Sequence, residues 1–481
     1  MFLASLAGPI LVGIAHGESE QAIRLTIVCA VGVFISGICT AATLGYRHAL
    51  THTRLILTMV LVWLTMSAIG ALPLYVAGNM PFGKALFESV SGLTTSGATL
   101  LTAREELPRS IIFWRVQLEW AGGFLTLASL FLVLSPLAIG GVPKRAIAAD
   151  WQMVMDDGRD AGLEHLKRYF PLLVFYGAAT LIVYFAFVAS GAGSLDAAYL
   201  TMTGISTGGF SPYDVELELH HGVPTIAVMA IVLAVSATSI FWQRYDVSSL
   251  LQRLVNNREA LWVFAIVGLM TLSYTVAFGA VSGWAPNWLS PSVIVDSAFA
   301  AASIVSTSGL ESRPGVIALL PETLVFSVAF FGAAVFSTSS GLKVHRLGAM
   351  LVQSVRELSL LIYPSSITPT RIAGARYSEN MLVEIWPVLV LLLAVMAIGV
   401  FALAGGTGSI ESAIVAAMAL VLNAAPLYDA FAPLGAAPDV WPQFRDFSAF
   451  EQLVAGVIML LGRLEFIAVF AILNVKFWIS R

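Results

Sequence analysis

The chain has 481 residues, of which 58% are hydrophobic and only 11% charged, and its formal net charge is −4. Its mean hydropathy is +0.86. A soluble domain carries roughly 25% charged residues to keep its surface hydrated, so this composition excludes soluble enzymes and soluble binding modules. The long unbroken apolar runs also exclude a membrane β-barrel, which would show alternation over about ten residues per strand. The sequence predicts an all-α integral membrane protein.

Long apolar stretches predict the membrane spans, since a helix needs roughly 20 residues to cross a bilayer. They are Ala22–Gly45, Leu55–Val76, Ser110–Ile139, Phe170–Ala189, Val223–Trp242, Leu261–Val281, Thr323–Leu347, Ile385–Leu403 and Val454–Trp478. The apolar Met1–Ala15 segment lacks the basic start of a signal peptide and is predicted to be a short first membrane segment. Of the 25 Lys and Arg residues, 17 lie in loops on one side of these spans, which orients that side toward the cytoplasm.

Four shorter apolar segments are too short to cross the bilayer, and each precedes a cluster of small or polar residues. They are Ala85–Leu93, Ala197–Ile205, Ser297–Val305 and Ser412–Leu422. Their length fits half-helices that enter the membrane and turn back. Asp196, Asp296 and Ser412 stand near the starts of three of them and are predicted to be N-caps.

The turns that end these four segments align with one another, at spacings of 112, 100 and 116 residues. The aligned residues are Thr94, Thr95, Ser96 and Gly97; Ser206, Thr207, Gly208 and Gly209; Ser306, Thr307, Ser308 and Gly309; and Leu422, Asn423, Ala424 and Ala425. Each unit therefore reads as span, half-helix, turn and span. A repeat of this length predicts four copies of one structural unit.

Such turns suit the binding of a dehydrated cation. Backbone carbonyls directed at one axis can replace the hydration shell of an alkali ion, and glycine readily adopts the conformations that this requires. The C-terminal ends of the half-helices would add negative dipole ends. The alternative is that these are helix-breaking turns buried in a packed bundle.

Five stretches resemble the TrkH/TrkG/KtrB superfamily of potassium transporters, and its TrkH branch in particular. They are Phe87–Leu101, Leu107–Gly123, Ser206–Ser211, Ser337–Arg346 and Leu460–Glu465. The resemblance implies an N-terminal extra helix pair (1–50) and four pore repeats (51–142, 143–256, 257–364 and 365–481) around a central pore. It implies that the sixteen turn residues bind potassium as a selectivity filter, with no covalent cofactor and no catalytic residue.

The same resemblance implies the cellular setting. It predicts a multi-pass protein of the bacterial inner membrane, surrounded by lipid and assembled as a homodimer. It also predicts a cytosolic nucleotide-binding regulatory subunit of the TrkA type as a partner, and no nucleic acid.

The sequence departs from the family pattern at two places. In the fourth turn, Ala425 stands where the family has glycine, and alanine in the left-handed region costs of order 1 kcal/mol. We therefore expect another geometry there. Within Thr323–Leu347 the family breaks the helix with a glycine-rich gate, but this chain has Ser339, Ser340 and the bulky Phe336. The gate is predicted to comprise Phe336, Ser337, Thr338, Ser339, Ser340, Gly341, Lys343 and Arg463.

Ionisable residues inside predicted spans are costly and are functional candidates. By resemblance, Arg463 projects into the pore beneath the filter, and the alternative is a structural ion pair with Glu465 or a neighbouring helix. Arg115 and Glu119 lie four residues apart and are predicted to pair with each other in a surface role.

Other function classes find less support. All seven histidines fall in loops or at span ends, and no Gly-Lys-Ser/Thr loop occurs, which disfavours an intramembrane hydrolase, a haem protein or an ATPase. The sequence predicts a subunit that translocates potassium or another monovalent cation. The alternatives are a non-conducting or regulatory paralogue, which Ala425 and Phe336 favour, a relaxed Na⁺/K⁺ pathway, and an ion-coupled carrier.

Overall fold

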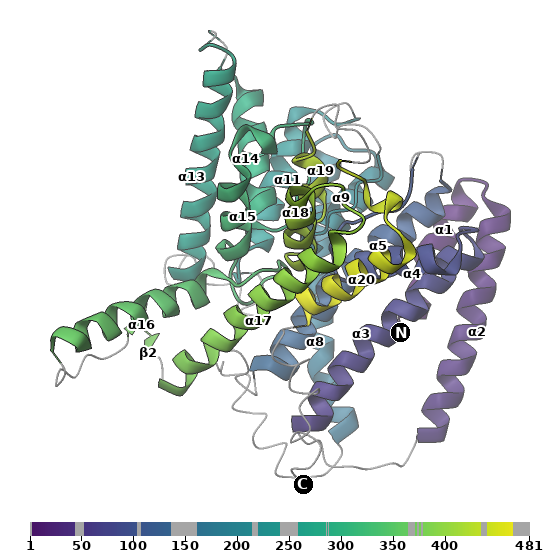
Figure 1. Ribbon diagram of the computed structural model, residues 1–481. Coiled ribbons are helices and arrows are strands. Elements are labelled where there is room, and N and C mark those ends of the chain that lie inside the picture. Colours follow the sequence, from purple (N-terminus) through teal and green to yellow (C-terminus); the bar gives the residue numbers. More distant parts are fainter. Residues whose placement is uncertain are drawn as a thin grey trace.

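The computed structural model describes residues 2–43, 52–102, 107–135, 161–213, 220–240, 258–284, 286, 288–363, 371–372, 375–376, 379–433 and 440–464. Among these residues, six helical segments are long and apolar enough to cross a membrane. They lie in α2 (Ser19–Thr43), α3 (His52–Val76), α5 (Arg109–Ser129) with its π-helical continuation η3 (Leu130–Leu134), α8 (Ala161–Ala189), α13 (Arg258–Val281) and α17 (Glu379–Leu403). The prediction of an all-α membrane protein is confirmed (Figure 1).

Shorter elements pack between the long helices. They are η1 (Leu3–Leu6), α1 (Ala7–Ala15), α4 (Phe82–Leu93), α9 (Ser194–Ser206), α11 (Val223–Ser236), α14 (Pro291–Val305), η6 (Ile317–Leu319), α15 (Glu322–Phe331), α16 (Val344–Ile362), α18 (Ile410–Val421), α19 (Pro426–Ala430), η7 (Phe444–Asp446) and α20 (Ala449–Arg463). The two-residue strands β1 (Arg371–Ile372) and β2 (Ala375–Arg376) pair antiparallel. The four predicted half-helices are α4, α9, α14 and α18.

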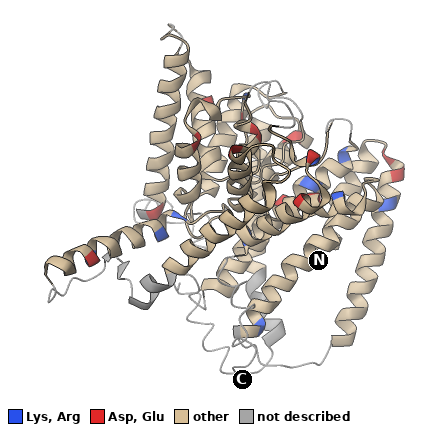
Figure 2. Cartoon of the chain, in the orientation of Figure 1, with Lys and Arg blue, Asp and Glu red and all other residues tan. Residues whose placement is uncertain are grey.

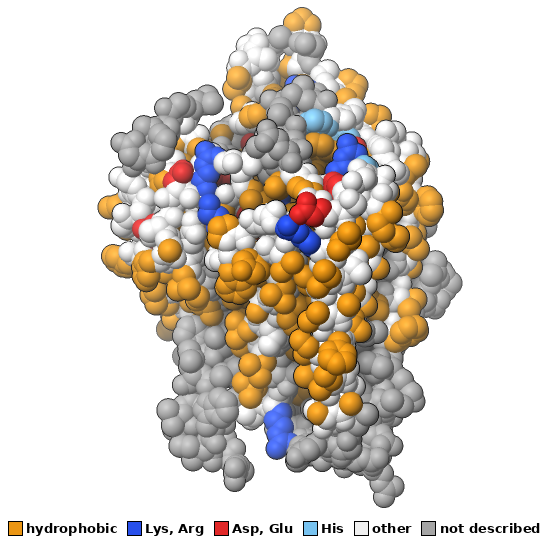
Figure 3. Space-filling view, turned by 90° about the vertical axis from the view of Figure 1, so that its right-hand side faces the viewer, with side chains coloured by type: hydrophobic (Ala, Val, Ile, Leu, Met, Phe, Trp, Pro, Cys, Tyr) orange, Lys and Arg blue, Asp and Glu red, His pale blue; other side chains and the backbone are white. Residues whose placement is uncertain are grey.

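The outer surface of the helices is apolar. Phe401 of α17 is 84% exposed and Ile182 of α8 is 70% exposed, and apolar side chains form a broad band across the face seen in Figure 3. The charged side chains among the described residues lie mainly near the ends of the helices (Figure 2). This arrangement suits helices that face lipid along their length and polar surroundings at their ends.

The half-helices begin earlier than the sequence predicts, so the predicted N-caps are wrong. Ser290 caps α14 by accepting a hydrogen bond from the backbone N–H of Val293, and Ser409 caps α18 in the same way through Ser412 N–H. Asp296 and Ser412 lie inside these helices, and Asp196 lies in the first turn of α9. In α14 and α18 an upstream serine provides the cap and moves the start toward the N-terminus, and in α14 it is followed by Pro291, which is favoured in a first turn.

The long apolar stretch Thr323–Leu347 does not form one helix. It divides into α15 and α16, and we call the non-helical residues 332–343 between them the break segment. Its backbone groups still find partners: Leu342 N–H donates to Phe330 O (2.7 Å), and Ala334 N–H donates to Ala237 O (2.9 Å). The helix is therefore interrupted here, although the glycines of the family pattern are replaced by serine.

Two of the predicted spans are shorter than expected within the described residues. Helix α11 ends at Ser236 rather than at Trp242, and α20 is described to Arg463. The π-helical turn η3 extends α5 to Leu134. Residues 136–160, 241–257 and 465–481 lie outside the described part of the chain, as do the predicted span ends within them.

Two half-helices, α4 and α18, are each crossed by the helix that follows them, α5 and α20. A glycine at each crossing allows the two backbones to come into direct contact. A Cβ on Gly122 of α5 would lie 1.9 Å from the carbonyl oxygen of Leu93, at the end of α4. A Cβ on Gly462 of α20 would lie 2.2 Å from the carbonyl oxygen of Val421, at the end of α18. The first and fourth half-helices are therefore held in place by the same kind of backbone contact.

We predict that Gly122→Ala destabilises the protein, because the new methyl group meets backbone rather than a movable side chain. Separating α4 from α5 should cost roughly 1–3 kcal/mol and lower the midpoint of thermal unfolding in detergent. Gly177→Ala in α8 is the matched control, since its new methyl group would meet no atom within 4 Å. Equal midpoints for the two variants would contradict the packing argument.

Candidate functional site

The four half-helices end in the same backbone motif. At each end one residue takes the left-handed conformation: Thr95 (φ 56°), Thr207 (φ 53°), Thr307 (φ 59°) and Asn423 (φ 49°). The next residue donates its N–H to the carbonyl five positions earlier, at 2.9 Å in every case: Ser96 to Ser91, Gly208 to Thr203, Ser308 to Ser303 and Ala424 to Ala419. This pattern is the Schellman closure of a helix C-terminus, and it recurs at the positions that the sequence aligns.

Three of these left-handed residues are threonine, in which that conformation is rare. It costs of order 1–2 kcal/mol for a residue other than glycine, so surrounding contacts have to hold it. The hydroxyl of Thr307 accepts a hydrogen bond from Ser340 N–H (2.9 Å), and the hydroxyl of Thr207 donates to Ser206 O (2.7 Å). Strain of this kind, held by its surroundings, is common at functional sites.

The four turns meet in one closed, buried ring. The fourth contacts the first, because Ala425 N–H donates to Ser96 O at 2.8 Å. The second and third are joined by the hydroxyl of Ser308, which donates to Gly208 O at 2.5 Å. A Cβ on Gly97 would lie 2.5 Å from Gly209 Cα, and one on Gly309 would lie 3.1 Å from Leu427 N. All sixteen predicted turn residues are buried, so the structure brings the whole predicted set together.

The glycines of the ring serve different purposes. Gly97 (φ 79°) and Gly309 (φ 73°) are left-handed, whereas Gly209 is not and is needed because of its close neighbours. Ala425 has φ −57° and ψ −31°, the right-handed region, and immediately precedes α19. The fourth turn therefore differs from the first and third at the position of Ala425, while Asn423 is left-handed like the aligned Thr95 and Thr307.

Two buried carboxylates brace the turns, and sequence reasoning did not assign them this role. Glu119 accepts the N–H groups of Gly209 (2.9 Å) and Phe210 (2.8 Å) on one oxygen and the Thr203 hydroxyl (3.2 Å) on the other. In the same way Glu88 accepts Leu100 N–H at 2.6 Å, just after the first turn. A carboxylate that receives several N–H groups fixes the backbone that supplies them.

The predicted pairing of Arg115 with Glu119 is wrong. Arg115 pairs with Glu88 (2.8 Å), and its guanidinium lies 4.2 Å from the ring centre of Phe210. Both Arg115 and Glu119 are fully buried, so each side chain is directed to a different turn rather than along a solvated helix face. The signal in the sequence was the presence of two ionisable residues in one apolar span.

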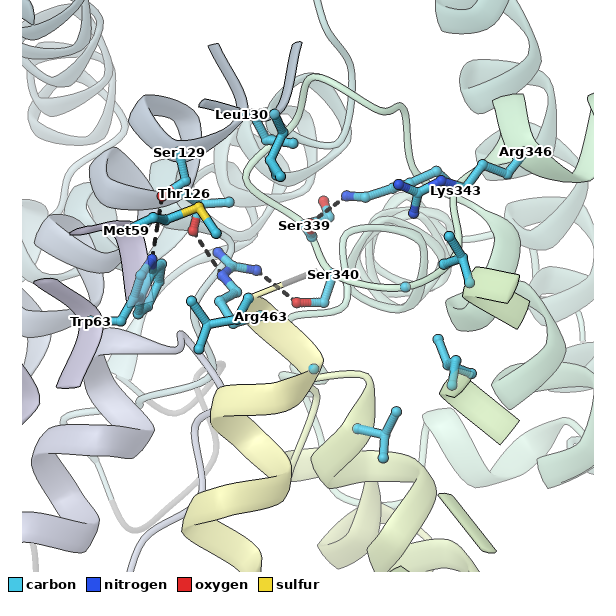
Figure 4. A pocket seen from close by; sticks show the side chains of 17 residues that line it. Met59, Trp63, Thr126, Ser129, Leu130, Ser339, Ser340, Lys343, Arg346 and Arg463 are labelled. Atoms are coloured by element: carbon cyan, nitrogen blue, oxygen red, sulfur yellow. Dashed lines mark hydrogen bonds between the residues drawn. The ribbon is translucent and has the colours of Figure 1, made fainter. Parts of the chain in front are cut away.

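Arg463 anchors the break segment. It donates to Ser340 Oγ (2.7 Å) and Thr338 O (2.5 Å) on that segment, and to Thr126 Oγ1 of α5 (2.8 Å). The close-up in Figure 4 shows its guanidinium between Thr126 and Ser340. Glu465, the alternative partner that the sequence suggests, lies outside the described residues.

The break segment also contacts the turns directly. Thr338 Oγ1 donates to Ile205 O (3.0 Å) at the end of α9, and Ser340 N–H reaches the third turn as described above. Within the segment, Lys343 Nζ donates to Ser337 Oγ (3.2 Å) and to Ser339 O. Phe336 is buried and stacks on Phe131 of η3 at 4.9 Å. The predicted gate residues therefore lie together, against the second and third turns.

Three further acidic side chains lie in the second and third repeats, near the half-helices α9 and α14. Burial raises the pKa of Glu311, beyond the third turn, to about 7, although the N–H groups of Ile317 and Gly315 act in the opposite direction. Asp296 pairs with Arg313 at 3.2 Å, and Asp196 accepts the hydroxyl of Tyr213 at 2.5 Å. Among the described residues, no cluster of three or more His, Cys, Asp or Glu could hold a metal ion.

We predict that Glu119→Ala loosens the second turn. The substitution leaves the buried N–H groups of Gly209 and Phe210 without an acceptor, which costs about 1–3 kcal/mol each, so hydrogen exchange at these amides should accelerate and the thermal midpoint should fall. Glu119→Gln keeps one acceptor oxygen, so its exchange rates and its thermal midpoint should lie between those of the wild type and of Glu119→Ala. Glu20→Ala, at a 69% exposed side chain, is the control, and unchanged exchange in Glu119→Ala would contradict this role.

Comparison with known proteins supports the resemblance drawn from the sequence. Residues 26–241 match the model of the TrkH family, described as cation transport protein. The chain is 26% identical to a Trk system potassium uptake protein TrkH of Halomonas elongata, covering 99% of this chain and 96% of that protein. It is 25% identical to the Trk system potassium uptake protein TrkH of Vibrio parahaemolyticus, covering 100% of this chain and 97% of that protein.

The fold agrees with a solved structure over almost its whole length. The crystal structure of the potassium transporter TrkH from Vibrio parahaemolyticus superimposes with a TM-score of 0.84, covering 99% of this chain and 96% of that one, at 24% identity. In its matching N-terminal half and in its all-helical membrane fold, the chain is similar to the TrkH family of cation transport proteins.

Proposed function

We propose that the chain translocates potassium across the bacterial inner membrane, as the membrane subunit of a Trk-type uptake system. The observation that carries this proposal is the ring of four turns, closed by contacts between neighbours and built from one repeated backbone motif. Such a ring can present several carbonyl oxygens to one axis, as dehydration of an alkali ion requires. The sixteen turn residues named above would bind the ion, and K⁺ is the transported species rather than a cofactor.

Selectivity would depend on how firmly the turns are held. Glu119 and Glu88 each fix backbone next to a turn through charge-assisted hydrogen bonds. The left-handed threonines are held by neighbouring groups in at least two turns. Under this proposal the ion moves down its electrochemical gradient, and no covalent chemistry takes place.

Gating would occur at the break segment. It lies against the second and third turns, and Arg463 ties it to α5 through Thr126. A conducting state requires this segment to move away from the ion path, so Phe336, residues 337–341, Lys343 and Arg463 would form the gate. The four-repeat division of the chain, with 1–50 as an extra helix pair, belongs to the same proposal.

The relatives are named as Trk system proteins, which supports a multi-component assembly here. We propose a homodimer in the lipid bilayer that is controlled by a cytosolic nucleotide-binding subunit of the TrkA type. No nucleic acid and no cofactor are part of this scheme.

A second candidate follows from the fourth turn. Ala425 is right-handed and leads directly into α19, whereas the aligned Gly97 and Gly309 are left-handed. A filter with one divergent turn could discriminate less well between Na⁺ and K⁺, or the chain could be a regulatory paralogue that does not conduct.

The decisive experiment measures uptake of radioactive rubidium into proteoliposomes that contain the purified protein, with potassium or sodium as competitor. Competition by potassium alone supports the potassium pathway, and equal competition by sodium supports the relaxed one. Absence of uptake, even after addition of a TrkA-type subunit, would favour the regulatory paralogue.

We predict that Gly209→Ala abolishes rubidium uptake while the protein still inserts and folds. The added methyl group would lie 2.8 Å from Pro426 Cγ, 2.9 Å from Ser308 O and 3.0 Å from Gly97 Cα, so it would push the other three turns apart. Gly83→Ala at the start of α4 meets no atom within 4 Å and should transport normally. Wild-type uptake in Gly209→Ala would remove the basis for the filter assignment.

We predict that Arg463→Ala raises rubidium uptake or weakens discrimination against sodium. The change removes the hydrogen bonds to Ser340, Thr338 and Thr126, so the break segment is released. Arg463→Lys keeps the charge but cannot match this forked geometry, and it should give an intermediate effect. Unchanged uptake and selectivity in a folded Arg463→Ala protein would argue against a gating role.

A further inference from the structure

A cavity of about 40 Å³ lies beside the break segment, and its wall is basic. It is bordered by α3, α5 with η3, the start of α16, α17 and α20. Lys343, Arg346 and Arg463 contribute to the wall together with Ser339 and Ser340, and none of the described residues that line it is acidic. Figure 4 shows these side chains around the cavity, with Arg463 and Lys343 on either side of the serines.

The charge of Arg463 lies deep in the protein. The residue is 7% exposed, and its hydrogen bonds to Thr126, Ser340 and Thr338 end on two hydroxyls and a backbone carbonyl, all of them neutral. A buried guanidinium is costly unless an anion compensates it. Lys343 and Arg346 on the same wall are 6% and 2% exposed, so three buried cationic side chains border the cavity.

An unpartnered polar atom provides a second, independent indication of a ligand. Ser339 is 2% exposed, lines the cavity, and its hydroxyl makes no hydrogen bond in the structure. A buried hydroxyl without a partner is unfavourable, and it suits a ligand oxygen. Helix α16 begins at Val344, next to this wall, so the positive end of its dipole adds to the effect.

The size of the cavity limits the ligand. By the measure in which one water needs roughly 10–15 Å³, a volume of 40 Å³ accommodates about three waters. This is room for one tetrahedral oxyanion but not for a nucleotide. Bidentate arginine contacts and hydroxyl donors are the groups that proteins use to bind phosphate.

We propose that this cavity binds a single phosphate group, either the phosphodiester of an anionic lipid head group or inorganic phosphate. Arg463 and Arg346 pair with the phosphate, and Ser339 donates to one of its oxygens. Because these residues come from the break segment, α16 and α20, the bound anion ties the break segment to two helices and stabilises its described position. The site shares Ser339 and Arg463 with the proposed gate, but its test measures binding and does not depend on transport.

The test uses the purified full-length protein after delipidation. Its thermal midpoint is measured while inorganic phosphate replaces chloride at constant potassium and ionic strength. Native mass spectrometry then records whether phosphatidylglycerol or phosphatidylcholine remains bound. For the wild type we expect either a saturable rise of the thermal midpoint with phosphate or retention of one phosphatidylglycerol molecule. Binding should be about tenfold weaker in Arg346→Gln, since a charge-assisted hydrogen bond contributes that factor or more to the affinity.

The variants separate this site from general charge effects. Ser339→Ala should fold normally because the hydroxyl has no partner, and it should weaken binding. Arg346→Lys keeps the charge but not the forked geometry and should bind with an affinity between those of the wild type and Arg346→Gln. Arg445→Gln, which removes a 42% exposed cation in η7, should retain the full affinity. A phosphate-induced shift identifies the inorganic ion, whereas lipid retention without such a shift identifies the head group.

Three results would overturn the proposal. One is the absence of binding by both phosphate and phosphatidylglycerol. Another is stabilisation by chloride equal to that by phosphate. The last is that Arg445→Gln weakens anion binding as much as Arg346→Gln does, which would indicate that the anion is attracted by the positive charge of the protein in general.

Discussion

Irregular backbone at membrane depth has to find hydrogen-bond partners within the protein, because lipid supplies none. This constraint shapes both the four turns and the break segment. The turns close their helices through i to i−5 hydrogen bonds and then exchange further bonds with one another. The break segment places its N–H groups on Ala237 O, Glu259 Oε1 and Thr307 Oγ1. The loops can be non-helical because other loops and side chains complete them.

The buried ionisable residues follow from the same constraint. Glu119, Glu88 and Arg463 are costly in an apolar bundle, and each one holds irregular backbone or its hydroxyls in place. Glu119 fixes the second turn from outside the ring, whereas Arg463 holds the break segment that touches the second and third turns. The positions of the turns and of the break segment are thus coupled through Thr307 and Ile205, which allows motion at one to affect the other.

The basic cavity connects the break segment to the start of α16 as well as to α20. Its wall includes the first residues of α16, the break segment and Arg463 of α20. An anion bound there would neutralise charge next to a proposed cation pathway and would also join the segments that have to separate if the gate opens. The described position of the break segment would then depend on both the arginine and its ligand.

The sequence by itself determined the helical membrane fold, the existence of four half-helices and the positions of their turns. Apolar length and repeated spacing are local properties of the chain, and they require no knowledge of neighbours. Through resemblance to a known family, it also identified the residues of the break segment and the substitution at Ala425 as points of interest. Only the tertiary structure decided that Arg115 pairs with Glu88 rather than Glu119, and that Glu119 instead holds the backbone of Gly209 and Phe210. Those outcomes depend on which side chains and turns meet in the buried interior, and a local pattern such as i, i+4 spacing contains no information about them.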